Sequence, residues 1–565
     1  MAAGDASEKL PFIEKVGYSL GDFAAQFVFL TLVNFQSGFY TDAVGISPNA
    51  ASFLVLITRL WDALFDPAMG FIADRTRTRW GRFRPWLIWT AIPWGVLMVL
   101  AFTVPPFRSY GATFCYALLT NMALWTIYSM NNTPYSALMA VMTGKQKERT
   151  SLSQYRFISA MIGQLIVGGF TLAIMTGIGT PVPPPPADLA RQQFTAMTQP
   201  ATTKMVIEVP TGADISKLTI NDTPAMKSYK EIKQAHDADA WPKTMAIYAV
   251  ICVICLAISF FTVRERITPL ETNKDSEKTF GGKLASIGTD MKLLGGNGPW
   301  LVMFLVTVTH YVLSSIRGPA YNSYVNYVLD PEAMRQFLVQ WHLPTIDPKA
   351  DPNSLSLWYK FLNASKLIIK ADNSNVPAVV YGLLQMTNKL WNVVGIIAAS
   401  FLIGRFNKKL VVSLSLILNT VFILGLYAVP YNNIWGVYIV EWLGQLAYAP
   451  TVPLLWVLYA DVCDYTEWKT GRNITGFIYA TFFFGLKAGL SLGNFIGLQV
   501  MGFFGYKANE IQSDQSKLGI LLTLTLIPGI FSVVCAVSML FYQITKKMNN
   551  QIADDLTQRR AEGTA

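Results

Sequence analysis

Apolar stretches long enough to cross a lipid bilayer recur along the whole chain, and they constrain its fold more than any other feature. Of the 565 residues, 52% are hydrophobic and only 14% are charged, whereas an average soluble protein carries about 25% charged residues. Because hydrocarbon offers no hydrogen-bond partners, such a chain crosses it as helices whose backbone groups are paired internally. The sequence therefore predicts an all-α polytopic membrane protein.

Twelve stretches have the length and composition of transmembrane helices. Between the sixth and the seventh, residues 264–297 are charged and poor in apolar side chains, as expected of a cytoplasmic linker. We therefore expect two pseudo-symmetric six-helix halves, residues 1–263 and 298–565. The predicted spans are 18–40, 49–73, 85–105, 110–142, 152–177, 244–263, 298–327, 377–404, 410–429, 433–460, 474–503 and 518–543.

Two long insertions, 178–243 and 330–375, interrupt the predicted bundle on its external side. In the first, residues 205–209 and 217–220 are candidate short strands; in the second, 334–341 is a candidate helix. Neither insertion contains a cysteine, so no disulfide is expected to close them. They are either solvated decorations or a cap that helps to select substrates.

Lysine and arginine concentrate in the loops on one side of the predicted bundle, for example at 75–84, 145–149 and 405–409. The short loops on the other side are nearly free of them. Since basic loops stay in the cytoplasm, both termini are expected there, in a multi-pass protein of the plasma membrane (a bacterial inner membrane). The net charge of +10 is therefore a topology signal and does not indicate nucleic-acid binding.

The second predicted span carries three charged residues, Arg59, Asp62 and Asp66, where each costs roughly 2.5–3.5 kcal/mol at the bilayer centre. The two carboxylates are four residues apart and therefore project from one helix face. Such a pair suits a bound cation or a shared proton. The alternative is that Arg59 only neutralises Asp62 to hold helices together, which leaves Asp66 without a partner.

An internal repeat supports the division into halves. Residues 59–75 align without a gap on 389–405, so that Arg-Leu-Trp-Asp lies over Lys-Leu-Trp-Asn. Duplicated halves around a central site are common in transporters. The repeat fails where Asp62 becomes Asn392 and Asp66 becomes Ile396, so a cation site is expected in the N-terminal half.

Other polar residues lie at membrane depth, and each has a plain structural alternative. Asp22 is also a candidate helix cap, and Asn131–Tyr135, with Pro134, a candidate kink. An isolated Lys487 needs an anion, for which Asp22, Asp62 and Asp66 are available. Four further residues lie at this depth: His310 is expected in the core, and Glu441 is expected to neutralise either Lys389 or Arg317.

Catalytic and metal motifs are missing from the sequence. Cys252 and Cys255 have a C-x-x-C spacing but lie inside a span, where packing is the expected role. No nucleophile–base pair, glycine-rich phosphate loop or metal-ligand cluster is recognisable. We therefore expect neither an enzyme nor a metal or cofactor beyond a coupling ion.

Several motifs in order resemble the glycoside–pentoside–hexuronide:cation symporters, the melibiose-permease-like branch of the major facilitator superfamily. They are residues 17–22, 39–42, 59–70 with 74–85, and 460–472, followed by Lys487. The resemblance covers both halves and excludes the two insertions. It implies the major facilitator fold and a secondary active transporter that couples a cation to symport of a sugar, glycoside or uronide by alternating access.

The resemblance also implies roles for individual residues. Asp62, Asp66 and Ser129 match the cation-coupling positions. Phe65 stands where sodium-using members carry Asn, which favours H⁺ over Na⁺. Residues at substrate-binding positions are Asp22, Tyr128, Asn132 and Arg156, with Lys487 facing them from the other half. Because Asn132 replaces a carboxylate of the melibiose branch, a galactoside preference does not carry over.

Two charged cytoplasmic loops are expected to form a latch that stabilises the outward-open state. The alternative is that they are solvated basic loops that only obey the orientation rule. The predicted latch residues are Asp74, Arg75, Arg149, Asp464, Glu467 and Arg472.

Two other functions remain open at this stage: a lysolipid-type carrier of the same fold, and a non-transporting membrane sensor. The first would need a headgroup-binding lysine, which Lys487 supplies; the second would tolerate loss of the carboxylate pair, which this chain retains. The expected partners are a small sugar or glycoside, the coupling cation and the bilayer. We expect no nucleic acid and a monomeric protein.

Overall fold

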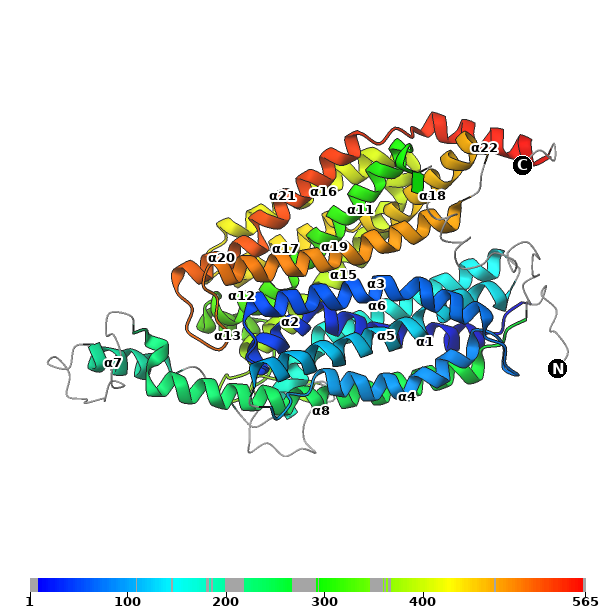
Figure 1. Cartoon of the computed structure of the whole chain (residues 1–565). Coiled ribbons are helices and arrows are strands. Elements are labelled where there is room, and N and C mark those ends of the chain that lie inside the picture. Colours follow the sequence, from blue (N-terminus) through cyan, green and yellow to red (C-terminus); the bar gives the residue numbers. More distant parts are fainter. Residues whose placement is uncertain are drawn as a thin grey trace.

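The structure, a computed structural model, describes residues 9–561 except 108, 144–145, 179–181, 184–185, 199–217, 267–290, 293, 346–358, 360–361, 364–366 and 472–473. The described residues form helices, turns and two isolated β-bridges, with no β-strand (Figure 1). The predicted all-α class is therefore confirmed.

The N-terminal group of helices lies together in the lower part of Figure 1. Within it, α1 packs on α6 and α8, α4 packs on α5 and α8, and α3 packs on α5. Its elements are α1 (Phe12–Asn34), α2 (Gln36–Gly38), η1 (Phe39–Ala43), α3 (Pro48–Arg75), α4 (Arg84–Ala101), α5 (Tyr110–Met142), α6 (Gln146–Ile178), α7 (Ala187–Thr198), η4 (Ile220–Asp222) and α8 (Pro224–Thr262).

The C-terminal group lies in the upper part of Figure 1. There, α11 packs on α19 and α21, and α16 packs on α17 and α21. Its elements are α11 (Gly298–Ile316), α12 (Gly318–Tyr327), α13 (Pro331–Gln340), α15 (Val376–Arg405), α16 (Lys408–Gly425), η5 (Leu426–Ala428), α17 (Ile434–Tyr448), α18 (Thr451–Thr470), α19 (Thr475–Phe503), α20 (Asp514–Leu524), α21 (Leu526–Leu540) and α22 (Lys546–Ala561).

The number of membrane-crossing helices stays a prediction. Among the described residues, nine segments are long and apolar enough to cross a membrane, and one of them, Ile434–Thr470, joins α17 and α18. The helices α3, α5 and α15 are not among the nine. These three helices coincide with the predicted spans 49–73, 110–142 and 377–404, so the prediction of twelve includes them.

Side-chain caps set where several helices begin. The N-terminal amides of a helix lack partners within it, and Ser, Thr, Asn and Asp side chains accept from them. Ser47, Thr223, Asn297 and Asp330 do so at α3, α8, α11 and α13. At the other end of α18, Gly471 takes a φ of 67°, a left-handed conformation that glycine adopts without strain.

The helix α8 differs most from expectation. It has 39 residues and is therefore about 58 Å long, whereas a hydrocarbon core is about 30 Å thick. Sequence analysis began the sixth span at residue 244, but the helix begins at Pro224, inside the first insertion. Of the candidate strands, 205–209 lies outside the described residues and Ile220 belongs to the 3₁₀ turn η4. The helix expected in the second insertion is confirmed as α13.

One end of the molecule, here called the insertion end, carries α7, η4 and α13; α22 and the start of α1 lie at the opposite, terminal end (Figure 1). The two groups touch at the insertion end. Gln499 donates to the Ser52 hydroxyl at 2.8 Å, and Phe53 packs edge-on against Phe495 with ring centroids 5.2 Å apart. A Cβ added to Gly382 would lie 2.2 Å from the carbonyl oxygen of Gly169, so α6 and α15 meet through bare backbone.

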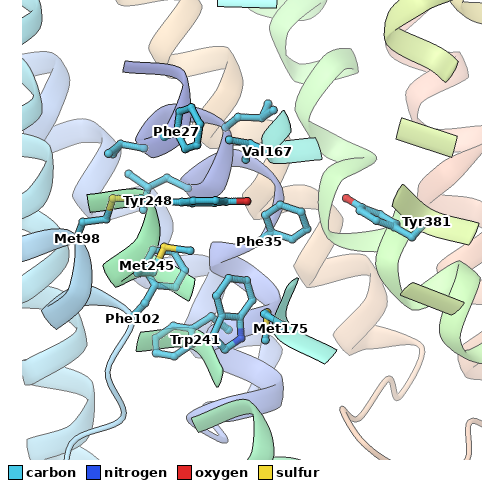
Figure 2. Packing of buried hydrophobic residues seen from close by; sticks show 14 of the residues in the cluster. Phe27, Phe35, Met98, Phe102, Val167, Met175, Trp241, Met245, Tyr248 and Tyr381 are labelled. Carbon is cyan, nitrogen blue, oxygen red and sulfur yellow. The ribbon is translucent and has the colours of Figure 1, made fainter. Parts of the chain in front are cut away.

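Aromatic residues fill the N-terminal group near the insertion end. Figure 2 shows Phe35 beside Trp241, with Tyr381 of the C-terminal group on the other side. The ring centroids of Phe35 and Tyr381 are 5.9 Å apart. Next to this layer, Asn509 donates to the carbonyl oxygen of Asp42 at 2.8 Å, and Lys230 pairs with Glu510 at 2.6 Å. These contacts close the two groups against each other at the insertion end.

Candidate cation and substrate site

A pair of carboxylates lies where α3 faces α5. Asp62 and Asp66 project from one face of α3, and Asp62 is 0% exposed. Ser129 of α5 donates to Asp62 Oδ1 at 2.7 Å and also contacts Asp66 Oδ1. A hydroxyl carries one hydrogen and donates to one carboxylate at a time, so the second contact is favourable when that carboxyl is protonated. The geometry therefore suits a pair that shares one proton.

Lys487 of α19 reaches the same carboxylates from the C-terminal group. Its ammonium nitrogen is 2.8 Å from Asp62 Oδ2 and forms an ion pair with Asp66 Oδ2 as well. We call Asp62, Asp66, Ser129 and Lys487 the carboxylate cluster. Lys487 thus has two of the three anions expected for it, Asp62 and Asp66, and its expected role in substrate binding stays a prediction. With both carboxylates ionised, the cluster has one negative charge in excess, which one cation or proton would balance.

Arg59 forms no ion pair with Asp62 within the described chain, so the direct pairing expected in the alternative for this span is not made. Its guanidinium carbon lies 3.9 Å from the centroid of the Trp125 ring, a cation–π arrangement. Arg59 is 1% exposed, and its Nε and Nη2 atoms form no hydrogen bond. Within the described chain Arg59 forms no ion pair, and Asp62 is paired with Lys487 of the C-terminal group instead.

Asp22 of α1 and Arg156 of α6 form a second charged pair, here called the sugar-side pair after the roles that the resemblance implies. Arg156 Nη2 donates to Asp22 Oδ1 at 3.1 Å, and its Nε donates to Oδ2. Such two-pronged contacts fix both orientation and charge. The Tyr135 hydroxyl accepts from the Asp22 amide at 3.2 Å and donates to the Tyr18 carbonyl at 2.7 Å. Asp22 is therefore part of a fixed network, beyond a simple helix cap.

Two polar side chains of α5 lie between these charged groups with unused hydrogen-bonding capacity. Tyr128 and Asn132 are one turn apart, and within the described chain neither side chain forms a hydrogen bond. The Tyr128 ring is fixed edge-on against Trp94 and Trp125, with centroids 5.6 and 5.3 Å away. Asn131, by contrast, donates to the Thr90 hydroxyl at 2.6 Å and is structural. Tyr128 and Asn132 therefore keep polar groups that no described residue uses.

The structure also resolves the ambiguity at Glu441. Arg317 Nη2 lies 2.5 Å from Glu441 Oε1, and Tyr321 donates to Oε2 of the same residue. Arg317 is thus the partner of Glu441, and Lys389 is not. His310 is a satisfied core residue, as expected, since its Nε2 lies 2.8 Å from the Tyr448 hydroxyl.

The latch stays a prediction. The side chains of Asp74, Arg149 and Arg472 lie outside the part of the chain that the structure describes. Arg75 and Asp464 are exposed and Glu467 is half-buried, each with an interaction of its own.

Sequence reasoning missed one anion at this end. Glu265 follows α8 and accepts from the backbone amides of Arg82, Phe83 and Arg84 at 2.9, 2.7 and 2.8 Å. A carboxylate favours the positive end of a helix, here the start of α4. Nothing in the spacing of Glu265 signals this long-range contact.

A cavity of about 180 Å³ lies at the insertion end between the two groups. Both insertions contribute to its lining, the first through Lys233 and Asp237 and the second through Lys370. Lys233 pairs with Asp237 at 2.6 Å, and Lys370 donates to the Thr176 carbonyl at 2.5 Å. Burial raises the pKa of Asp42, which follows α1 in the same lining, to about 6. The insertions are therefore packed against the bundle.

A helical membrane protein with two groups of helices, charges between them and a ligand-accessible polar site has the features of a secondary transporter. The chain belongs to the family described as "MFS/sugar transport protein", which matches residues 17–346 and 368–546. It is accordingly a membrane transporter and not an enzyme.

Relatives resemble the chain over nearly its whole length. The putative glycoside/cation symporter YagG of Escherichia coli K12 is 26% identical over 98% of this chain and 96% of its own. The isoprimeverose transporter of Lactiplantibacillus pentosus is 24% identical over 98% and 93%.

Solved structures share the fold. An inward open conformation of the xylose transporter XylE from E. coli has a TM-score of 0.51 and 11% identity, covering 95% of this chain and 96% of that one. The nucleoside transporter NupG has a TM-score of 0.51 and 11% identity, covering 94% and 100%.

Proposed function

We propose that the protein is a cation-coupled symporter of a sugar, glycoside or uronide. The observation that carries this proposal is the carboxylate cluster, in which two carboxylates of one group of helices meet a single lysine of the other. A buried pair with one charge in excess provides both a cation site and a link between the groups. Relatives named as a glycoside/cation symporter and an isoprimeverose transporter support the substrate class.

The cluster offers a direct mechanism of coupling. A cation that binds Asp62 and Asp66 competes with Lys487 for the same oxygens, and therefore loosens the tie between α3 and α19. The equilibrium between the two arrangements of the groups then depends on the cation, as coupling requires. The sugar-side pair, with Tyr128 and Asn132, holds the substrate beside this tie.

We favour H⁺ over Na⁺ as the coupling ion. Phe65 packs against Trp61 with ring centroids 6.3 Å apart and supplies no oxygen. A proton needs one carboxylate oxygen and a hydrogen-bond acceptor, which Asp66 and Ser129 provide.

The orientation and the division of the chain belong to the same proposal. Residues 1–263 and 298–565 form the two halves, 264–297 is the cytoplasmic linker, and both insertions are external. The closed insertion end is then the outer end, and the structure corresponds to an inward-facing arrangement. We further propose that the insertions cap this end, that the latch acts in the opposite arrangement, and that the protein works as a monomer in the bacterial inner membrane.

The test is substrate-induced proton uptake by energised membrane vesicles, across a panel of glycosides, pentosides and uronides, with and without Na⁺. We expect one sugar to cause alkalinisation of the medium without Na⁺. Strict Na⁺ dependence would overturn the choice of ion, and a response to lysolipid alone would favour a lipid carrier. No response to any sugar, with the protein present in the membrane, would overturn sugar symport.

A further inference from the structure

Lys389 of α15 is a charged residue of the bundle interior that the proposed mechanism does not use. Its side chain is half-buried, and within the described chain it has neither an ion pair nor a hydrogen bond. An intramembrane lysine without an anion is costly, and such residues commonly mark a ligand or ion pathway. The residue therefore needs an explanation that packing does not give.

The other cations expected at this depth are already engaged. Arg156 is bound to Asp22 in the sugar-side pair, and Arg317 is bound to Glu441. Lys487 belongs to the carboxylate cluster. Arg59 is stacked on an aromatic ring and almost fully buried, which keeps a ligand away from it. Among the cations expected from the sequence, Lys389 is the one left for a substrate.

The helix geometry directs Lys389 toward the N-terminal group. Gly382, Gln385 and Lys389 are spaced three and four residues apart and share one face of α15. Gly382 meets the backbone of Gly169 on α6, and a Cβ added to Gly168 would lie 3.4 Å from the Cβ of Gln385. Lys389 is on the same face, about 10 Å further toward the terminal end.

The close contact between α6 and α15 does not continue to the level of Lys389. Ile158 and Ile162 share the face of α6 that carries Gly169, and both are exposed, whereas Gly169 and Gly382 meet directly. Arg156 lies on α6 about 20 Å from the glycine contact, and therefore about 10 Å beyond Lys389 along the helix axes. A ligand bound at Lys389 would therefore lie about 10 Å along the helix axes from the sugar-side pair.

We propose that Lys389 determines specificity by binding a carboxylate of the substrate, so that the protein prefers an acidic glycoside, a uronide, to its neutral counterpart. This inference rests on the proposed sugar symport. A charged hydrogen bond compensates a half-buried ammonium far better than a sugar hydroxyl does. The two carboxylates of the cluster are tied to Lys487 and do not compete for Lys389.

The experiment compares matched ligands on the full-length protein in proteoliposomes. The probes are p-nitrophenyl β-glucuronide with β-glucoside, and β-galacturonide with β-galactoside, which within each pair differ only in carboxylate against hydroxymethyl. We expect wild type to prefer the acidic member of at least one pair about tenfold or more. Lys389→Gln should abolish this preference and leave affinity for the neutral member within about twofold, while Lys389→Arg should retain most of the preference.

The outcomes separate the two proposals. Equal or better binding of the neutral members by wild type, with proton uptake intact, would overturn the role of Lys389 and leave sugar symport standing. The same conclusion would follow if Lys389→Gln weakened both members of a pair equally. If no member of either pair binds to correctly inserted protein, the role of Lys389 is overturned, and sugar symport is overturned only if the vesicle panel also gives no response to any sugar.

Discussion

The helices α3 and α15 occupy matching positions in the internal repeat, yet they join the two groups in different ways. On α3, Asp62 and Asp66 are held by Lys487 of the other group. On α15, the matching positions are Asn392 and Ile396, and the contact with α6 is made by the backbone of Gly382. One interface is electrostatic and therefore sensitive to a cation, whereas the other is steric. A duplicated framework thus places the proposed coupling chemistry at one of two similar interfaces.

The same comparison holds for the two cations that overlie each other in the repeat. Arg59 on α3 is fixed over Trp125 and almost inaccessible. Its counterpart, Lys389 on α15, is half-buried without a partner in the described chain. The first stabilises the N-terminal group, and the second is available to a ligand.

The largest effect is expected from removing a carboxylate at the electrostatic interface between α3 and α19. Asp62→Asn should reduce concentrative uptake at least about 100-fold, because removing one partner of a buried pair costs about 3–5 kcal/mol. Sugar binding should persist, which equilibrium exchange across vesicles measures. Full accumulation by this variant would contradict the coupling role.

A matched variant at the interface between α15 and α6 tests whether the two interfaces differ in function. Asn392→Asp places a carboxylate at the position that overlies Asp62. We expect it not to restore accumulation in the Asp62→Asn background, since residues 148–178 of α6 contain no lysine. Restored accumulation would show that a carboxylate works equally well at either interface.

The second prediction concerns the steric interface between α15 and α6. Gly382→Ala places a methyl group 2.2 Å from the Gly169 carbonyl oxygen, and overpacking of this kind costs about 1–3 kcal/mol. The insertion end should then close less often, which cysteine labelling at Ser374 would report as greater accessibility. Gly425→Ala is the control, because its added Cβ would lie 4.0 Å from the nearest side-chain atom. Equal labelling in the two variants would argue against a tight closure.

A smaller effect is expected from removing the serine hydroxyl of the carboxylate cluster. Ser129→Ala removes the hydroxyl oxygen that accepts a hydrogen bond from a protonated Asp66, an interaction of about 0.5–1.5 kcal/mol that exists only in the proton-loaded cluster. The apparent affinity for H⁺ should therefore fall up to about tenfold, with little change in sugar affinity. Proton-dependent uptake measured across external pH would show this as a shift of the half-maximal point. A loss of sugar affinity alone would place Ser129 in the substrate site instead.

The smallest effect is expected from an ion pair at the edge of the contact between the two groups at the insertion end. The ion pair of Lys230 with Glu510 has a lysine side chain that is 45% exposed, and such pairs contribute about 0–1 kcal/mol. Lys230→Gln should therefore change the uptake rate by less than about fivefold. A much larger loss in transport assays would mean that this ion pair, and not the two helix interfaces, controls whether the insertion end is closed.

The sequence predicts helix positions and faces well, because apolar length and spacing depend on local chemistry. It placed Asp62 and Asp66 on one face and indicated Ser129 through the family resemblance. It left the partners of Lys487 and Glu441 open, since several cations compete for few carboxylates and only packing between helices decides the pairing. The early start of α8 escaped notice because its first half is polar, and amphipathic polar helices leave little signal in a search for apolar spans.

The length of α8 has a mechanical consequence. About 28 Å of this helix extends past a hydrocarbon core of about 30 Å, so its Pro224 end lies roughly 43 Å from the membrane centre. A rigid-body tilt of about 15°, of the size seen when subunits rotate, would move that end by about 11 Å. The neighbouring Asn221 is bound to the backbone of Ile511 of the other group. The helix therefore acts as a long arm, and the contact of Asn221 with Ile511 has to break before the insertion end can open.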